Sequence, residues 1–213
     1  MSAEPDHLSP RAYHDRTKHQ LDRYAAGPGT LDWDAQPDPF RRYADCPEFP
    51  LALTTAPGTV SFGDLHRPGA ITPAPVDRAG VGRLLEVALG LSAWKQYGPD
   101  RWALRCNPSS GNLHPTEGYV VSRGLPDLPD GVYHYRPDQH LLEQRAGFSA
   151  AATASAPAVL LGLSSIHWRE AWKYGERAYR YCQLDVGHAL AALAYGAALL
   201  GWQLRQLTEW SAA

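Results

Sequence analysis

The fold is decided by the stretch Asn107-Pro108-Ser109-Ser110-Gly111-Asn112-Leu113-His114-Pro115-Thr116-Glu117-Gly118-Tyr119-Val120-Val121. Its first half clusters turn-forming residues whose side chains donate and accept hydrogen bonds. Its second half is an apolar run of the kind that forms strands. Loops that hold a ligand against a rigid scaffold have this composition. We therefore expect a binding loop followed at once by a strand over residues 117–122.

Two interpretations of the loop remain open on chemistry alone. Ser109, Ser110 and Asn112 suit a heteroaromatic ring or a phosphate, and Gly111 lets the backbone approach a flat ligand closely. Arg105, just upstream, is then the partner of an anion. Alternatively, one of the two serines caps a short helix over residues 112–117.

Composition narrows the class of protein. The 213 residues are 44% hydrophobic and 20% charged, as in an ordinary globular domain. The formal charge of −2 argues against nucleic acid as a partner. The three cysteines, Cys46, Cys106 and Cys182, have no metal-ligand spacing, and the start of the chain does not resemble a signal peptide. We expect a cytoplasmic protein.

Periodicity and turn residues predict an α+β fold with a central, mostly antiparallel sheet. Asp77 is the expected N-cap of the first core helix, and Gly90 its end. Further strands are expected at 131–136, at 140–145 as a hairpin, and at 157–163 as a buried central strand. The remaining expectations are a loop at 92–99, a short helix at 148–155 and a final strand at 203–210. Residues 1–75 read as a Pro- and Gly-rich arm, with the domain proper at 76–213.

The longest helix is expected over residues 176–200, after a short helix at 168–174 that Gly175 ends. Its Ala and Gly content permits very close packing, and it is apolar nearly all round. That pattern predicts burial on every side, in the core and in a subunit interface. The apolar part, 186–202, is slightly shorter than the ~20 residues of a membrane-spanning helix, so we expect no membrane partner.

Cations and aromatic residues are concentrated at 166–181, just before this helix. An amine beside aromatic surface, as at Lys173-Tyr174, can serve as a base. Arg177 and Arg180 share a helix face and could bind a phosphate together. Weak surface salt bridges with Glu170 and Glu176 are the simpler interpretation of the same residues.

Together the two clusters resemble the nitroreductase-fold flavoproteins, and within them the SagB/ThcOx-type dehydrogenases. The resemblance lies in 108–115 running into 117–121, in 131–135, and in 172–181 followed by 184–188. It covers about residues 76 to 205. The arm, with Leu31-Asp32-Trp33, is similar to that of larger tandem members, so the chain resembles the N-terminal half of such a protein.

The resemblance implies an oxidoreductase that binds FMN, with hydride transfer at flavin N5. The matching positions for cofactor binding are Arg105, Pro108, Ser109, Ser110, Gly111, Asn112, Arg177 and Arg180. Lys173 and Tyr174 match a catalytic Lys-Tyr pair that removes a proton. The implied partners are an azoline or other small heterocycle, free or in a modified peptide, and NAD(P)H for a reductase. A homodimer, or pairing with a second nitroreductase-like domain, is also implied.

One departure from the family pattern supports an alternative. Relatives carry an Arg-x-Ser-x-Arg type of phosphate motif before the first core helix, where this chain offers only His66-Arg67. The alternative is a degenerate, non-catalytic domain that serves dimerisation or scaffolding.

Overall fold

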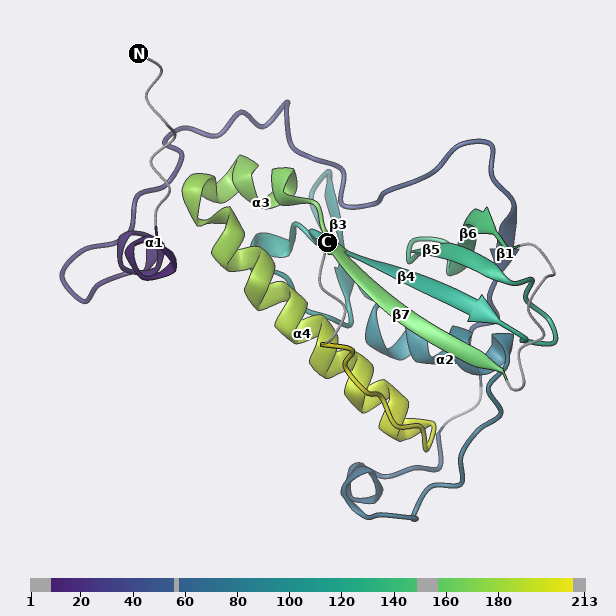
Figure 1. Ribbon diagram of the computed structural model, residues 1–213. Coiled ribbons are helices and arrows are strands. Elements are labelled where there is room, and N and C mark those ends of the chain that lie inside the picture. The colour runs from purple at the N-terminus through teal and green to yellow at the C-terminus, as the bar shows by residue number, and fades with distance from the viewer. Residues whose placement is uncertain (1–8, 56–57, 149–156, 209–213) are drawn as a thin grey trace.

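The computed structural model describes residues 9–55, 58–148 and 157–208 (Figure 1). The helices are α1 (Pro10–Thr17), α2 (Arg78–Ala88), α3 (His167–Tyr174) and α4 (Ala178–Leu199). The strands are β1 (Glu48–Pro50), β2 (Leu91–Tyr97), β3 (Asp100–Arg105), β4 (Thr116–Arg123), β5 (Gly131–Arg136), β6 (Leu141–Gly147) and β7 (Ala158–Ser165). Three short 3-10 turns add η1 (Phe62–His66), η2 (Ser110–Asn112) and η3 (Gly175–Arg177).

Five strands form an antiparallel sheet in the order β1-β6-β5-β4-β7, so the expected α+β fold is confirmed. The expected strand at 157–163 exists as β7, but its central position was wrong. Among the residues that the structure describes, it lies at the sheet edge and pairs with β4 alone. Its apolar run has two roles, because Val159 and Leu161 pack against the core while Leu160 between them is exposed.

Helices α2 and α4 pack together against one face of this sheet (Figure 1). Asp77 caps α2 as expected, since its carboxylate accepts a 2.7 Å hydrogen bond from the Gly80 N–H. Gly196 of α4 lies where a Cβ atom would meet Leu84 Cδ1 of α2 at 2.9 Å. The small residues of α4 therefore serve close helix packing, which brings the N-terminal part of α4 beneath the loop at 107–115.

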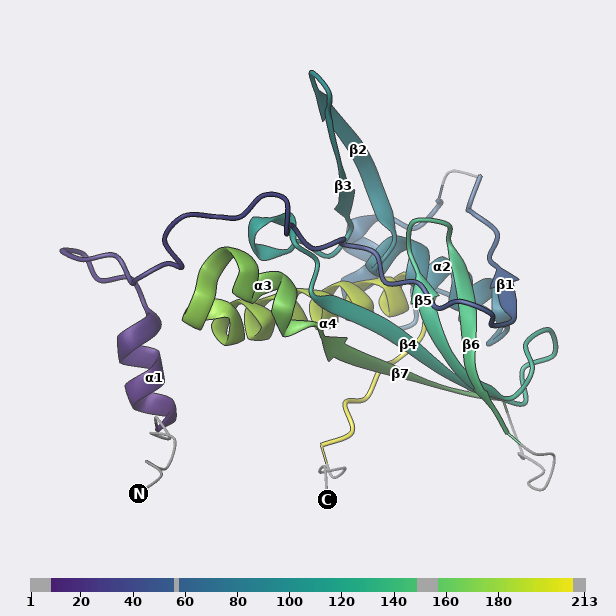
Figure 2. The same ribbon diagram turned by 90° about the horizontal axis from the view of Figure 1, so that it is seen from above.

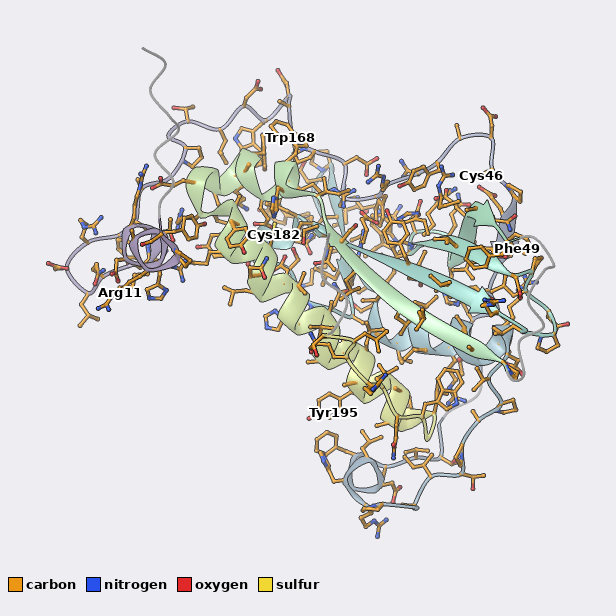
Figure 3. All side chains as sticks on the ribbon, in the orientation of Figure 1. Arg11, Cys46, Phe49, Trp168, Cys182 and Tyr195 are labelled. Atoms are coloured by element: carbon orange, nitrogen blue, oxygen red, sulfur yellow. The ribbon has the colours of Figure 1, made fainter. Side chains whose placement is uncertain are left out.

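Helix α4 is covered on one face by its own chain, and the expected burial of its other face in a subunit interface stays a prediction. One face lies in the core with Ala189, Leu193 and Ala197, whereas Leu184, Leu190 and Tyr195 are 53%, 42% and 50% exposed (Figure 3). A helix that is apolar all round need not be covered by its own chain. Within the described residues, no helix combines the length and hydropathy required to cross a membrane.

The loop expected at 92–99 is instead strand β2, which pairs with β3 in a hairpin that projects from the body (Figure 2). Its turn is made at Gly98, whose φ of 58° favours glycine. The strand expected at 203–210 is absent over 203–208, while 209–210 and the helix expected at 148–155, apart from Phe148, lie outside the described residues. Just before this segment, the Trp202 indole N–H donates to the Ala74 carbonyl at 2.8 Å.

The N-terminal arm runs over the surface of α3 and the hairpin before it reaches the sheet (Figures 1 and 2). The Trp172 indole N–H donates to the Asp32 carbonyl at 2.7 Å, and the Trp33 and Trp172 rings meet edge to face. Three elements of the arm were not predicted from the sequence: helix α1, which begins at a proline, the edge strand β1 and the 3-10 turn η1. The boundary at residue 75 stays a prediction.

Candidate active site

The loop is a compact turn and not the start of a helix. Ser110–Asn112 form a single 3-10 turn, and Thr116 already begins β4, so the helix considered over 112–117 is wrong. The Ser109 hydroxyl accepts a 2.8 Å hydrogen bond from the His114 N–H, which closes the loop. Gly111 and Asn112 have φ values of 62° and 59° in the left-handed region.

Helix α3 meets this turn at Gly111. A Cβ atom there would lie 2.6 Å from the Tyr174 hydroxyl and 3.0 Å from Lys173 Cδ, so the missing side chain leaves room for both residues. The two clusters expected to share a site, the loop and the Lys173-Tyr174 pair, are therefore brought into contact. Lys173 Nζ forms no hydrogen bond or ion pair with any residue that the structure describes. The site thus has an amine and a phenol beside an exposed stretch of backbone.

Beneath the turn lies a buried acidic group that the sequence analysis did not recognise. The Ser110 N–H and hydroxyl both donate to Asp185 Oδ1 of α4, at 3.0 and 3.1 Å. Cys182, one turn earlier on α4, is buried as well (Figure 3), and burial raises the pKa of its thiol to about 12, with the charges of Glu170 and Asp185 adding to the effect.

Glu170 of α3 belongs to the same group, and its interpretation as a surface salt bridge was wrong. Its side chain is 0% exposed, and neither carboxyl oxygen has a partner among the described residues. Burial and the nearby Asp185 charge raise the pKa of Glu170 to about 8, against the opposing charge of Lys173. The phenol of Tyr174 is affected too, since burial and the Glu170 charge raise its pKa.

The remaining loop residues hold one another. Asn112 donates from Nδ2 to the Ala103 carbonyl at 2.9 Å, and its Oδ1 lies 2.8 Å from the His114 ring. Pro108 is exposed beside them. A cavity of about 360 Å³ opens next to Asn112. Its walls come from the arm, the hairpin and the loop: Gln36, Pro37, Asp38, Pro39, Phe40, Trp94, Arg101, Trp102, Ala103, Asn112 and Leu113.

The three arginines expected at the cofactor all have protein partners in this structure. Arg105 is buried and donates to the carbonyls of Thr116 and Pro39, at 3.2 and 2.6 Å. Burial lowers the pKa of its guanidinium to about 10. Arg105 therefore joins the exit of the loop to the arm.

Arg177 and Arg180 both hold the N-terminal arm. Arg180 donates to the His14 carbonyl at 2.8 Å and to the Thr17 hydroxyl at 3.0 Å. Arg177 lies 3.0 Å from the His19 ring and 3.2 Å from the Tyr181 hydroxyl. The pair does share one side of the helix start, as expected, but its partners are protein groups.

A second buried network supports the site from behind. Each ring nitrogen of His134 lies 2.8 Å from a carboxylate oxygen, one of Glu117 and one of Glu143. Arg169 of α3 donates to Glu117 and, at 2.7 Å, to the His114 carbonyl of the loop. Burial opposes ionisation of Glu117, but His134, Arg105 and Arg169 outweigh it and the net effect lowers the pKa of Glu117. The sequence analysis did not predict this network. The only signal for it is the alternation of the two strands, which places Glu117 and His134 on their buried faces.

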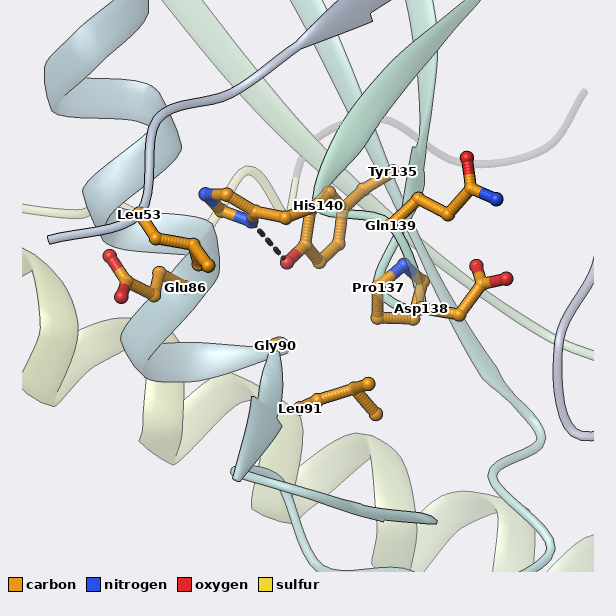
Figure 4. Close-up of a pocket in the computed structure, with 9 residues that line it drawn as sticks. All are labelled: Leu53, Glu86, Gly90, Leu91, Tyr135, Pro137, Asp138, Gln139 and His140. Carbon is orange, nitrogen blue, oxygen red and sulfur yellow. Dashed lines mark hydrogen bonds between the residues drawn. The ribbon is translucent and has the colours of Figure 1, made fainter. Parts of the chain in front are cut away.

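A smaller cavity of about 230 Å³ lies under the base of the hairpin (Figure 4). The Tyr135 hydroxyl lies 2.8 Å from His140 Nδ1 at its wall. The lining contains none of the residues expected to bind a cofactor: it consists of Leu53, Glu86, Gly90, Leu91, Tyr135, Pro137, Asp138, Gln139 and His140.

The antiparallel sheet, the long packed helix and the loop that faces a Lys-Tyr pair define an α+β protein of the nitroreductase type. The profile of the Nitroreductase family matches residues 70–208, and the chain belongs to this family. Membership supports an oxidoreductase.

Three relatives agree with this assignment. A nitroreductase-like protein of Methanocaldococcus jannaschii is 32% identical over 100 residues, which is 42% of this chain and 50% of that protein. A crystal structure of a nitroreductase-like protein from Anabaena variabilis has a TM-score of 0.65 and 29% identity, and covers 88% of this chain. One from Ralstonia eutropha (TM-score 0.52, 19% identity, 72% of each chain) shares the fold. This chain spans half of the first relative and 38% of the second.

Proposed function

We propose that this protein is an FMN-dependent oxidoreductase whose flavin ring lies against the loop at 108–113, with Lys173 and Tyr174 as its proton-transfer groups. The observation that carries the proposal is the contact at Gly111, where a turn without a side chain meets an amine and a phenol. Family membership supplies the class of chemistry.

The ring end of a flavin fits these residues. Pro108 and Gly111 present exposed backbone, the Lys173 amine has no partner among the described residues, and the cavity beside Asn112 has flat walls at Phe40 and Trp94. A bound flavin would supply hydride transfer at N5, and the protein would orient it. Lys173 would take or give the accompanying proton, and the Tyr174 hydroxyl would hold the reacting group near the turn.

The phosphate end does not fit the two arginines nominated for it while the arm is docked. Arg177 and Arg180 have partners in α1 and in the segment after it. We therefore assign neither of them to the phosphate in this arrangement, and Arg105 contributes only by holding the loop.

The substrate and the assembly remain part of the proposal. An azoline or another small heterocycle, free or in a modified peptide, follows from the resemblance to the SagB/ThcOx type, with NAD(P)H as reductant in the opposite direction. Because this chain spans 38% of the Anabaena variabilis protein, a second nitroreductase-like domain, or a second copy, is the proposed cover for the exposed Leu184, Leu190 and Tyr195 of α4.

A binding titration tests the flavin. The purified protein, mixed with FMN, should quench flavin fluorescence and retain a yellow band near ~450 nm after gel filtration, since the chromophore is the cofactor's own. Lys173→Ala should bind FMN as the wild type does but reduce a nitroaromatic probe, 4-nitrobenzoate with NADH, about 10²-fold more slowly. Equal turnover in Lys173→Ala would remove this residue from the chemistry.

A second function, a non-catalytic scaffold domain, is favoured by one observation: the arm occupies the arginine pair. A colourless protein that takes up no added FMN, yet dimerises in solution, would support that function and overturn the oxidoreductase.

A further inference from the structure

Glu170 lies at the buried end of the candidate site, on the same helix as the Lys173-Tyr174 pair. Residues three and four positions apart on a helix are neighbours, so its carboxyl group lies one turn before the amine and the phenol. The side chain is completely buried, and within the described ranges neither oxygen has a hydrogen-bond partner. A polar group in that state costs free energy, because water is lost and nothing replaces it. Such groups in native structures call for an explanation.

The groups that face Glu170 define its charge. Helix α4 presents Asp185 and Cys182, and α3 itself presents Lys173 and Tyr174. Asp185 accepts hydrogen bonds from both the N–H and the hydroxyl of Ser110, and such bonds favour a carboxylate. Two adjacent carboxylates in one apolar interior cannot both ionise without a large cost. Glu170, which receives no donor, is the one that keeps its proton at neutral pH, and its pKa of about 8 agrees.

We propose that Glu170 is a positioning residue that stores a proton for Lys173 and so renews the acid of the site. The inference rests on the proposed function. Reduction of a substrate needs a hydride, which a bound reduced flavin would supply, and a proton, which the Lys173 ammonium would give. The resulting amine would take the proton of the Glu170 carboxyl across a bridging water, because the two side chains form no direct hydrogen bond. The buried carboxylate would regain its proton through Lys173 when the site reopens to solvent. Oxidation of a substrate runs the same transfers in reverse.

The geometry explains why such a store is useful here. Lys173 lies under the turn at Gly111, half-buried, and a substrate on the turn would cover it further. A carboxyl on the interior side of the amine can restore the proton while the outer side is closed. A surface carboxylate such as Glu176, which pairs with Arg16 at 2.5 Å, has no route to the amine.

Chemical labelling of Lys173 tests the coupling without flavin or substrate. The full chain is treated with N-hydroxysuccinimidyl acetate between about pH 6 and 10, the range in which an amine and a shifted carboxyl titrate, and acetylation of Lys173 is measured by peptide mass spectrometry. In the wild type, ionisation of Glu170 should hold the proton on Lys173 and delay its labelling. In Glu170→Gln the labelling profile should move to lower pH by about one unit, a tenfold difference in rate at a fixed pH.

Two controls keep this result interpretable. Glu176→Gln removes a carboxyl on the neighbouring η3 turn and should label as the wild type does. Glu170→Asp retains an ionisable group and should keep the delayed labelling profile. It serves as the second variant if Glu170→Gln folds poorly. Identical profiles in the wild type, Glu170→Gln and Glu170→Asp would overturn the proposal.

Turnover separates this inference from the proposed function. With FMN, NADH and 4-nitrobenzoate, Glu170→Gln should lower kcat about tenfold at pH 7 with little change in KM. The wild-type kcat should decline above about pH 8, and Glu170→Gln should lack that decline. If Glu170→Gln shifts the labelling of Lys173 but the protein binds no flavin, the proposed oxidoreductase function is wrong, while the proton link between Glu170 and Lys173 stands. Unchanged kcat and an unchanged pH profile in Glu170→Gln would remove Glu170 from the reaction.

Discussion

Two buried acidic clusters lie behind the same loop, and they are built in opposite ways. In the cluster of Glu117, His134 and Glu143, every carboxylate has a cationic or ring N–H partner. In the cluster of Glu170 and Asp185, one carboxyl is fully bonded and the other has no partner among the described residues. A satisfied network rigidifies a core, whereas a buried group left without partners marks a candidate for function. We therefore expect the cluster of Glu117, His134 and Glu143 to stabilise the fold, and the cluster of Glu170 and Asp185 to take part in the chemistry.

The largest effect is expected where the satisfied cluster is broken. His134→Ala would leave two buried carboxylates without their shared ring, and removal of one partner from a buried charge pair costs about 3–5 kcal/mol. Urea unfolding followed by circular dichroism measures the loss. His140→Ala is the matched control, because this buried histidine contacts no carboxylate among the described residues; its ring lies 2.8 Å from the Tyr135 hydroxyl, and its loss should cost less. Equal losses would mean that the cluster adds nothing beyond the burial of a ring.

The second effect has opposite signs in the two clusters. The pKa of Glu117 is lowered, so its contribution to stability is present above the ordinary value and is lost as pH falls through the folded-state pKa. The pKa of Glu170 is raised from 4.5 to about 8, so the folded state binds more protons and stability falls as pH rises between those values. The slope of the unfolding free energy approaches about 1.4 kcal/mol per pH unit between the two pKa values.

Unfolding midpoints measured across that range check the assignment. Glu170→Gln should lack the decline between the two pKa values, whereas Glu117→Gln should lose stability overall and keep the decline. A wild-type curve that rises steadily towards pH 8, and that Glu170→Gln does not alter, contradicts a protonated Glu170.

The sequence predicts features that depend on neighbouring residues, but it does not predict contacts that depend on tertiary packing. The Asp77 cap, the strands 131–136 and 117–122 and the break at Gly175 were predictable, because capping, alternation and turn chemistry act over a few residues. That the loop and the Lys173-Tyr174 pair share a site came from the family resemblance, and the structure brings the two into contact at Gly111. Burial of Glu170 was not predictable, because a charged residue on an amphipathic helix is normally on its solvated side. The contacts that Arg177 and Arg180 make with the arm were not predictable either, because α1 and His19 just after it lie more than 150 positions away. Cofactor binding by the two arginines stays a prediction.

A third prediction concerns the turn at Gly111, which lies between the loop and helix α3. Gly111→Ala places a Cβ atom 2.6 Å from the Tyr174 hydroxyl at a φ of 62°. Strain in the left-handed region and displacement of α3 should cost about 1–3 kcal/mol. Gly98→Ala is the control, since its φ of 58° is similar and nothing lies within 4 Å of the added atom. If thermal unfolding shows equal losses in both, the contact with Tyr174 is not tight, and the pair is not held against the loop.

The smallest effect is expected at the arm. Arg180→Ala removes exposed and half-buried hydrogen bonds to α1, and such surface contacts contribute about 0–1 kcal/mol. Global stability should hardly change, but limited proteolysis within residues 9–40 should become faster, because the arm loses its anchor on α4 while the sheet and both acidic clusters stay intact. The arm could also cover cations that the FMN phosphate would use. In that case Arg180→Ala should not bind FMN more tightly, because it removes one of those cations. Deletion of residues 1–20 should bind FMN more tightly, because it frees Arg177 and Arg180 together. Weaker FMN binding after that deletion would show that the arm is part of the site and not a competitor for its arginines.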